Sequence, residues 1–347
     1  MWTQGVGHAW STTRASELTT SWGEVMTVTD RPIRARRPRL GGMFAPGAET
    51  PSSVSGPAWA FVRVLAGLLW LYNVAWKRPP DFGQDHGNSV YGFTRDAVDH
   101  PVFAPYSWVV EHLVLPHFTL FGWSVLVVES LLAVLLLTGT MTRLAALLGV
   151  AQSLAIGLSV ANTPGEWPWS YWMMIGVHVA LLVSPSSRFA AVDAVRAEAA
   201  GSPARHGSAS RLLGGWGVVV GLTGLWALIV SIGEDPFAST GSQLGGSALS
   251  VSLGSYNLAG AVVLLAMAAL LVVAAWRRRA VFALAAAAVG ALAALSLYAQ
   301  LSRTDVWLGG SNTSAAYFLC PVLLAVVMAR VLAEPAGRVA TTGDTQA

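Results

Sequence analysis

Long apolar stretches separated by short polar segments dominate this chain from residue 57 onward. Eight of them approach or reach the roughly 20 residues that an α-helix needs to cross a bilayer. We expect helices because backbone amides in lipid must be hydrogen-bonded within their own segment. The predicted spans are 57–76, 118–138, 142–161, 169–184, 212–232, 257–276, 279–301 and 314–333.

The eight predicted helices fall into two similar groups of four. In each group a first span is followed by a longer connection, then by two spans joined through a tight arginine-bearing turn, then by a last span. An even number of spans per unit gives both units the same orientation, as in a parallel repeat. The expected organisation is a disordered basic tail at 1–56, a first unit at 57–193, a linker at 194–211, a second unit at 212–338 and a disordered tail at 339–347.

The composition predicts an all-α integral membrane protein. The 347 residues are 54% hydrophobic and 11% charged, with a mean hydropathy of +0.55, which is too apolar for a typical soluble domain. A single lysine among 21 basic residues, with abundant alanine and glycine, favours a GC-rich bacterial genome. The expected partner is therefore the lipid bilayer of a bacterial plasma membrane, and no nucleic-acid partner is expected.

Arginine placement predicts how the spans are oriented. Arginines gather in alternate connecting segments and in the first tail. By the positive-inside rule, both termini are expected in the cytoplasm. No cleavable signal peptide is expected, because the polar tail leads directly into the first span. The segments expected outside hold only the basic residues Lys77, Arg78, Arg95 and Arg303.

Three ionisable side chains, Arg63, Glu129 and His178, lie inside apolar spans, all of them in the first unit. At a rise of 1.5 Å per residue they lie roughly 9, 13 and 9 Å from the same edge of the membrane. Such groups are costly in lipid and often mark functional sites. Two interpretations are open. Either Arg63 and Glu129 form an ion pair beside a hydrogen-bonded core histidine, or all three line a pocket for a quinone head group, with His178 relaying protons.

Other redox chemistry is restricted by the residues available. One cysteine, Cys320, cannot ligate an iron–sulfur cluster alone. A b-type haem is not expected either, because it needs two facing histidines and only His178 is well inside a span. The histidines and acids of the first outer loop lack metal-ligand spacing, so no metal site is predicted. A redox centre would then be a bound quinone or flavin, or would belong to a partner protein, and the pocket interpretation of the three buried charges favours a quinone as electron acceptor.

Charged residues and glycines recur through the first unit in a definite order. An arginine, a glycine and a lysine mark the first span, a glutamate precedes a glycine and a Thr-Arg pair, and a small-residue turn with an arginine and an aspartate closes the unit. These residues are Arg63, Gly67, Lys77, Glu129, Gly139, Thr142, Arg143, Arg188 and Asp193. In this order, residues 57–193 resemble the DoxX/DoxD family of bacterial membrane proteins. Asn73, where the family often has glycine, and the long first outer loop depart from the family pattern.

The resemblance implies a membrane subunit of a quinone-linked oxidoreductase, acting on a reduced sulfur compound such as thiosulfate with a second oxidoreductase subunit as partner. Glu129 and His178 are then the candidate catalytic residues, and Arg63, Lys77 and Arg143 the candidate binding residues. Lys77 or Arg303 is expected to attract an anionic substrate from outside.

Two other functions stay open. The first is a non-enzymatic scaffold that recruits a redox or oxidative-stress enzyme, in which the buried charges serve packing alone. Transport is less favoured, because no span is visibly broken in mid-bilayer by paired glycine or proline.

Overall fold

The computed structural model describes residues 55–84, 89–246, 248, 250–300 and 307–335. All eight predicted apolar helices are present, most of them close to the predicted boundaries. They are α1 (Ser55–Val74), α4 (Phe118–Thr138), α5 (Thr142–Val160), α6 (Pro168–Val183), α8 (Pro203–Val230), α9 (Leu258–Arg277), α10 (Ala280–Gln300) and α11 (Asn312–Ala333). Among the described residues, seven helices are long and apolar enough to cross a membrane, and α6, at 16 residues, is shorter. This is the architecture of a multi-pass, mainly helical membrane protein.

The largest difference from the predicted spans is at the start of α8, which begins at Pro203 rather than at residue 212. The expected linker at 194–211 is mostly helical, since it contains the end of α7 (Val192–Ala197) and the first two turns of α8. The side chain of Ser202 caps α8 by accepting a hydrogen bond from the Arg205 backbone N–H at 3.2 Å, and Pro203 occupies the first helical turn. Serine followed by proline is a favourable helix start. The expected tails lie outside the described residues, apart from 55–56, where α1 begins.

The first long connection is also helical. It contains α2 (Val90–Asp99) and α3 (Ala104–Val109), followed by a π-helical turn at Val110–Val114 and a 3₁₀ turn at Leu115–His117 that lead into α4. Ser89 caps α2 by accepting a hydrogen bond from the Gly92 backbone N–H at 3.1 Å. One face of α2 packs on α5, so this connection covers one end of the first group of helices.

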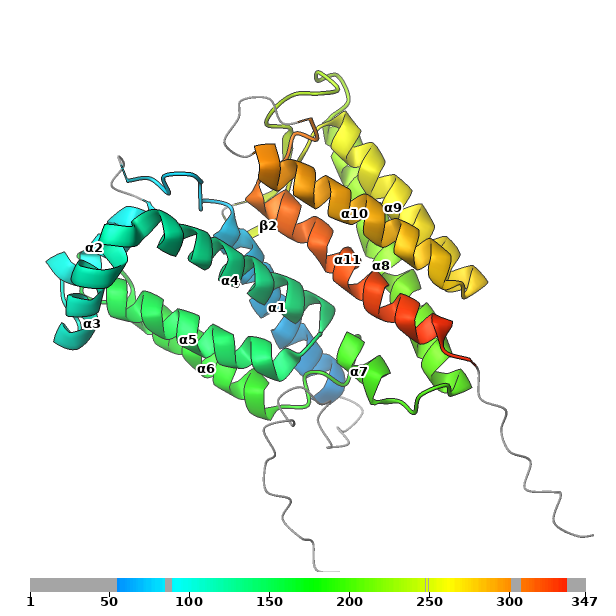
Figure 1. The fold of residues 1–347 in the computed structure, drawn as a ribbon, viewed down its shortest axis with the longest axis horizontal. Helices are drawn as coiled ribbons and strands as arrows, with labels where there is room; N and C mark the ends of the chain where they lie inside the picture. Colours follow the sequence, from blue (N-terminus) through cyan, green and yellow to red (C-terminus); the bar gives the residue numbers. More distant parts are fainter. Residues whose placement is uncertain (1–54, 85–88, 247, 249, 301–306, 336–347) are drawn as a thin grey trace, which may run out of the picture. The chain divides into compact units, whose positions relative to one another are not determined.

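The eight apolar helices form two bundles (Figure 1). In the first bundle, α1 packs on α4 and α5 packs on α6, and further contacts join α4 to α5 and α1 to α6. The second bundle repeats this order with α8 on α9, α10 on α11, α9 on α10 and α8 on α11. The bundles meet where α11 packs on α4 and α1. The two predicted groups of four helices therefore correspond to two packed bundles.

A small β-hairpin lies between α8 and α9, where no strand is predicted. Strands β1 (Ser242–Gly246) and β2 (Val251–Tyr256) pair antiparallel, with an irregularity between Leu244 and Gly245. Strand β2 contacts α1 and α11. The hairpin therefore fills the corner where the two bundles meet.

Candidate functional site

Helix α1 and the turn after it carry three large buried side chains at seven-residue intervals, Arg63, Trp70 and Lys77. Seven residues are almost two full helical turns, so Arg63 and Trp70 lie on one face of α1, whereas Lys77 extends from the turn that follows the helix. Each of the three contacts a different part of the first bundle. Arg63 contacts Gly139 at the end of α4, whereas Lys77 follows the end of α1, so the two residues mark opposite ends of the bundle.

Arg63 holds the segment that leads into α7. Its Nη2 donates hydrogen bonds to the backbone oxygens of Phe189 at 3.3 Å and Ala190 at 2.9 Å. Its guanidinium also lies against Gly139, where an added Cβ would stand 1.5 Å from Arg63 Nη1. The predicted ion pair between Arg63 and Glu129 is therefore wrong, because the two residues have different partners at different levels of the bundle.

Asp193 lies at the same end of the bundle as Arg63 and binds the start of α5. Its carboxylate accepts hydrogen bonds from the backbone N–H groups of Met141 at 3.1 Å and Thr142 at 3.0 Å, at the start of α5. A carboxylate is favourable there because the first amides of a helix lack partners within the helix and point outward. Arg63, Gly139 and Asp193 thus form a joint that connects α1, α4, α5 and α7.

His178 is a buried, fully hydrogen-bonded side chain. Its Nε2 lies 2.9 Å from Trp70 Nε1, and its Nδ1 lies 2.8 Å from the backbone oxygen of Met174. An indole N–H only donates, so Nε2 accepts and Nδ1 carries the hydrogen of the neutral ring. Gly149 makes room for the ring, since a Cβ there would stand 1.9 Å from His178 Cδ2. These contacts favour the interpretation of His178 as a core residue rather than a proton relay.

Glu129 forms a buried ion pair with Lys77. The distance between Lys77 Nζ and Glu129 Oε2 is 2.7 Å, and both residues are 1% exposed. Gln152 donates to Glu129 Oε1 at 3.2 Å, and Lys77 Nζ also donates to the backbone oxygen of Asn73 at 2.9 Å. Burial lowers the pKa of the Lys77 ammonium, and Glu129 partly offsets that effect. The expectation that Lys77 attracts an anion from an outer loop is therefore wrong.

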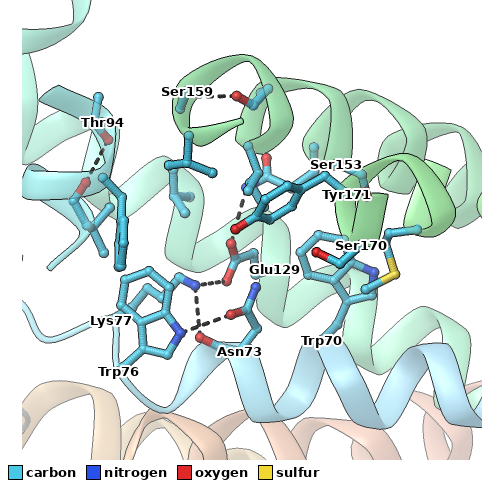
Figure 2. A pocket seen from close by; sticks show the side chains of 18 of the residues that line it. Trp70, Asn73, Trp76, Lys77, Thr94, Glu129, Ser153, Ser159, Ser170 and Tyr171 are labelled. Carbon is cyan, nitrogen blue, oxygen red and sulfur yellow. Dashed lines mark hydrogen bonds and ion pairs between the residues drawn. The ribbon is translucent and has the colours of Figure 1, made fainter. Parts of the chain in front are cut away.

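The ion pair forms part of the wall of a cavity of about 440 Å³ in the first bundle (Figure 2). The cavity occupies the half of the bundle in which α1 and α5 end and α4 and α6 begin, and α2 and α3 contribute to its lining. Its lining is mainly apolar and rich in aromatic rings. These rings belong to Trp70, Trp76, Phe93, Tyr106, Phe121 and Tyr171.

Among the described lining residues, one buried hydroxyl has no partner. Ser153 Oγ is buried and makes no hydrogen bond to any described residue. Most other polar side chains are already engaged. Tyr106 shares a 2.9 Å hydrogen bond with Ser159, Trp76 donates to the Asn73 side chain at 2.9 Å, and Tyr171 donates to Glu166. Because a buried unpaired hydroxyl is unfavourable, Ser153 is the polar group best placed to bind an occupant of the cavity.

The structure thus brings only one of the predicted catalytic residues, Glu129, to the cavity. Of the predicted binding residues, Lys77 lines it, whereas Arg63 and Arg143 belong to the opposite end of the bundle. Arg303 lies outside the described residues. His178 does not line the cavity itself, but it bonds to two residues that do, Trp70 and Met174.

Sequence reasoning missed the uncharged lining residues Trp70, Gln152, Ser153 and Tyr171. Gln152 was the most visible of these, because an amide inside an apolar span needs a polar partner. The aromatic residues gave no comparable signal, since aromatic side chains are common in membrane helices and at their ends.

No family model, no curated protein and no solved structure matches this chain. Six of the nine residues that carry the predicted DoxX/DoxD resemblance lie at two places in the structure. Arg63, Gly139, Thr142 and Asp193 meet at the joint, and Lys77 meets Glu129 at the cavity. Among the described residues, no group of three or more His, Cys, Asp or Glu is arranged to hold a metal ion.

Proposed function

We propose that this chain is a membrane subunit of a quinone-linked oxidoreductase and that the cavity of the first bundle binds the quinone ring. The observation that supports this proposal most directly is the combination, in one cavity, of an aromatic lining, an unpartnered buried hydroxyl, Ser153 Oγ, and the buried Lys77–Glu129 pair. The proposed location is a bacterial plasma membrane, with both termini cytoplasmic.

The dimensions and lining suit a ring-shaped ligand. Small-molecule sites are usually concave, mainly apolar and about 300–1,000 Å³ in volume, with a few polar groups that fix the orientation of the ligand. A cavity of about 440 Å³ falls in this range. The aromatic rings offer faces and edges for a planar ligand, an arrangement worth about 0.5–1.5 kcal/mol per ring pair beyond area burial.

The polar groups suit the two carbonyl oxygens of a quinone. The hydroxyl of Ser153 is free to donate to one oxygen, and the ammonium of Lys77 is a proton-bearing group in the same wall. Reduction of a quinone to a quinol takes up two electrons and two protons. We propose that a second subunit delivers the electrons from a reduced sulfur compound such as thiosulfate. Lys77 and Glu129 then hold and pass protons, and His178 positions Trp70.

Direct binding tests this proposal. The full chain in lipid nanodiscs is titrated calorimetrically with 1,4-naphthoquinone, with empty nanodiscs as the blank. Ser153→Ala should weaken binding about fivefold, because a hydrogen bond contributes about 1 kcal/mol. Ser124→Ala is the matched control, since Ser124 is an exposed serine of α4 that bonds to the Leu120 backbone oxygen at 2.9 Å. Absence of binding to the unaltered chain, or equal affinity in Ser153→Ala, would contradict the proposal.

The non-enzymatic scaffold is the second candidate, and one observation favours it. The buried charges Arg63, Glu129 and Lys77 all have partners within the chain, as a purely structural role requires. A scaffold would capture a redox enzyme from detergent-solubilised membranes while binding no quinone. Thiosulfate-dependent quinone reduction in membranes that contain the chain, and its loss in Glu129→Gln, would instead support the oxidoreductase subunit.

A further inference from the structure

The described cavity wall contains few charged side chains, and its negative charges outnumber its positive ones. Of the described residues that line the cavity, only Lys77, Glu129 and Glu166 carry ionisable acidic or basic side chains other than tyrosine. Lys77 Nζ and Glu129 Oε2 are 2.7 Å apart, so the electrostatic effects of the two charges on a ligand in the cavity largely cancel. Glu166 has no such counter-charge, since no described basic residue forms an ion pair with it. The wall therefore carries a net negative charge.

Local structure holds Glu166 in place. It follows a tight turn in which Gly165 has a φ of +90° and the Glu166 backbone N–H donates to the Thr163 oxygen at 3.2 Å. Tyr171, in the first turn of α6, donates its hydroxyl to Glu166 Oε2. Hydrogen bonds to a carboxylate are among the stronger ones in proteins, so this bond fixes the acid against the cavity. Both residues are partly exposed and both line the cavity.

Lys77 does not provide an anion site. Its ammonium donates to the Asn73 backbone oxygen, pairs with Glu129 and lies 3.5 Å from the centre of the Trp76 ring. An anion would have to displace Glu129 and leave a second carboxylate buried without its partner. Breaking a buried ion pair in this way is strongly unfavourable.

We infer that the cavity selects an uncharged planar ring and excludes anions, with Glu166, held by Tyr171, as the specificity-determining residue. This inference rests on the proposed quinone-binding function and refines it. An anionic reductant such as thiosulfate is then not oxidised inside this cavity. Its electrons must enter from a site elsewhere, on the proposed second subunit.

Two ligands with the same ring test the inference. The full chain in nanodiscs is titrated with 1,4-naphthoquinone and with 1,4-naphthoquinone-2-sulfonate, which adds one negative charge. The unaltered chain should bind the uncharged quinone about tenfold more tightly or better, the order of effect expected for one nearby like charge in a partly buried site. In Glu166→Gln the ratio of the quinone affinity to the sulfonate affinity should fall several-fold. Removal of the negative charge should raise the affinity for the sulfonate more than the affinity for the uncharged quinone.

The controls separate charge from shape. Glu166→Asp keeps the charge and should keep most of the discrimination, whereas Glu111→Gln removes an exposed acid outside the cavity and should leave the ratio unchanged. An unchanged ratio in Glu166→Gln, or equal binding of both ligands by the unaltered chain, overturns the inference alone. Absence of binding by either ligand overturns the proposed quinone function as well.

Discussion

Among single residues, Lys77 and Glu129 have the largest expected influence on the first bundle. Both side chains are almost fully buried, and each provides the counter-charge of the other. The net contribution of such a pair to stability is small, because removing two charges from water offsets most of their attraction. Loss of one partner has a much larger effect, since it leaves a buried charge without a counter-charge.

A double-mutant comparison measures this coupling. Lys77→Met and Glu129→Leu should each lower the free energy of unfolding by about 3–5 kcal/mol, whereas the double variant should lose much less than the sum. SDS-induced unfolding in detergent provides the measurement. Additive losses in the double variant would show that the two side chains do not stabilise each other.

The sequence shows which residues are costly in lipid, but not which of them meet. Distance along a helix axis follows from residue number, so Arg63, Glu129 and His178 were predicted at similar depths. Their partners depend on how each helix is rotated and on where its chain turns. Lys77 follows the last residue of α1, Val74, by three residues, and the turn at Val74–Lys77 directs it back onto Glu129. A hydrophobicity profile does not predict that turn.

At the scale of helices, close packing depends on small residues at a few positions. Gly67 of α1 faces Leu137 of α4, where an added Cβ would stand 2.8 Å from the leucine Cγ. Gly149 of α5 faces His178 of α6 in the same way, at 1.9 Å from Cδ2. Small residues let helices approach closely in membranes, where van der Waals packing supplies much of the association energy.

Gly149→Ala tests this packing against a glycine without a neighbour. The added methyl group should displace His178 and lower the free energy of unfolding by about 1–3 kcal/mol, as overpacking of a core does. Gly176→Ala in α6 is the matched control, because no atom lies within 4 Å of its added Cβ. The control should be neutral or stabilising by up to about 1 kcal/mol. Equal effects on the unfolding midpoints of the two variants would contradict this account.

The apolar helices were predictable because the length of an apolar run determines whether it spans a bilayer. Helix α2 was missed because its ten residues mix polar and apolar side chains and form a stable helix only against α5. The hairpin was missed for a similar reason. Strand β1 contains two glycines and only one leucine, and its pairing depends on β2 and on neighbouring helices. Short elements of this kind are determined mainly by tertiary contacts.

At the scale of the whole molecule, the second bundle supports the cavity without lining it. The side-chain amide of Asn312, at the start of α11, donates to the backbone oxygen of Lys77. Thr313 donates to the Leu71 oxygen at 3.5 Å. The apolar second unit thus holds the end of α1, and with it the backbone from which the Lys77 side chain extends.

Asn312→Ala should therefore weaken naphthoquinone binding several-fold, although Asn312 does not line the cavity. Thr223→Val is the control within the second bundle, since it removes a 2.8 Å hydrogen bond that joins α8 to α11 and does not involve α1. Both variants should lower the free energy of unfolding by roughly 1–3 kcal/mol, the cost of losing a buried hydrogen bond. Undiminished ligand affinity in Asn312→Ala would show that the two bundles function separately.

The cavity lies in the half of the first bundle where α1 ends, opposite the joint formed by Arg63 and Asp193. In the proposed orientation this is the half nearer the periplasm. Protons for quinol formation would then be drawn from the same side as electrons from an extracellular sulfur compound. No net charge would cross the membrane during turnover, so this step would feed the respiratory quinol pool without itself generating a membrane potential.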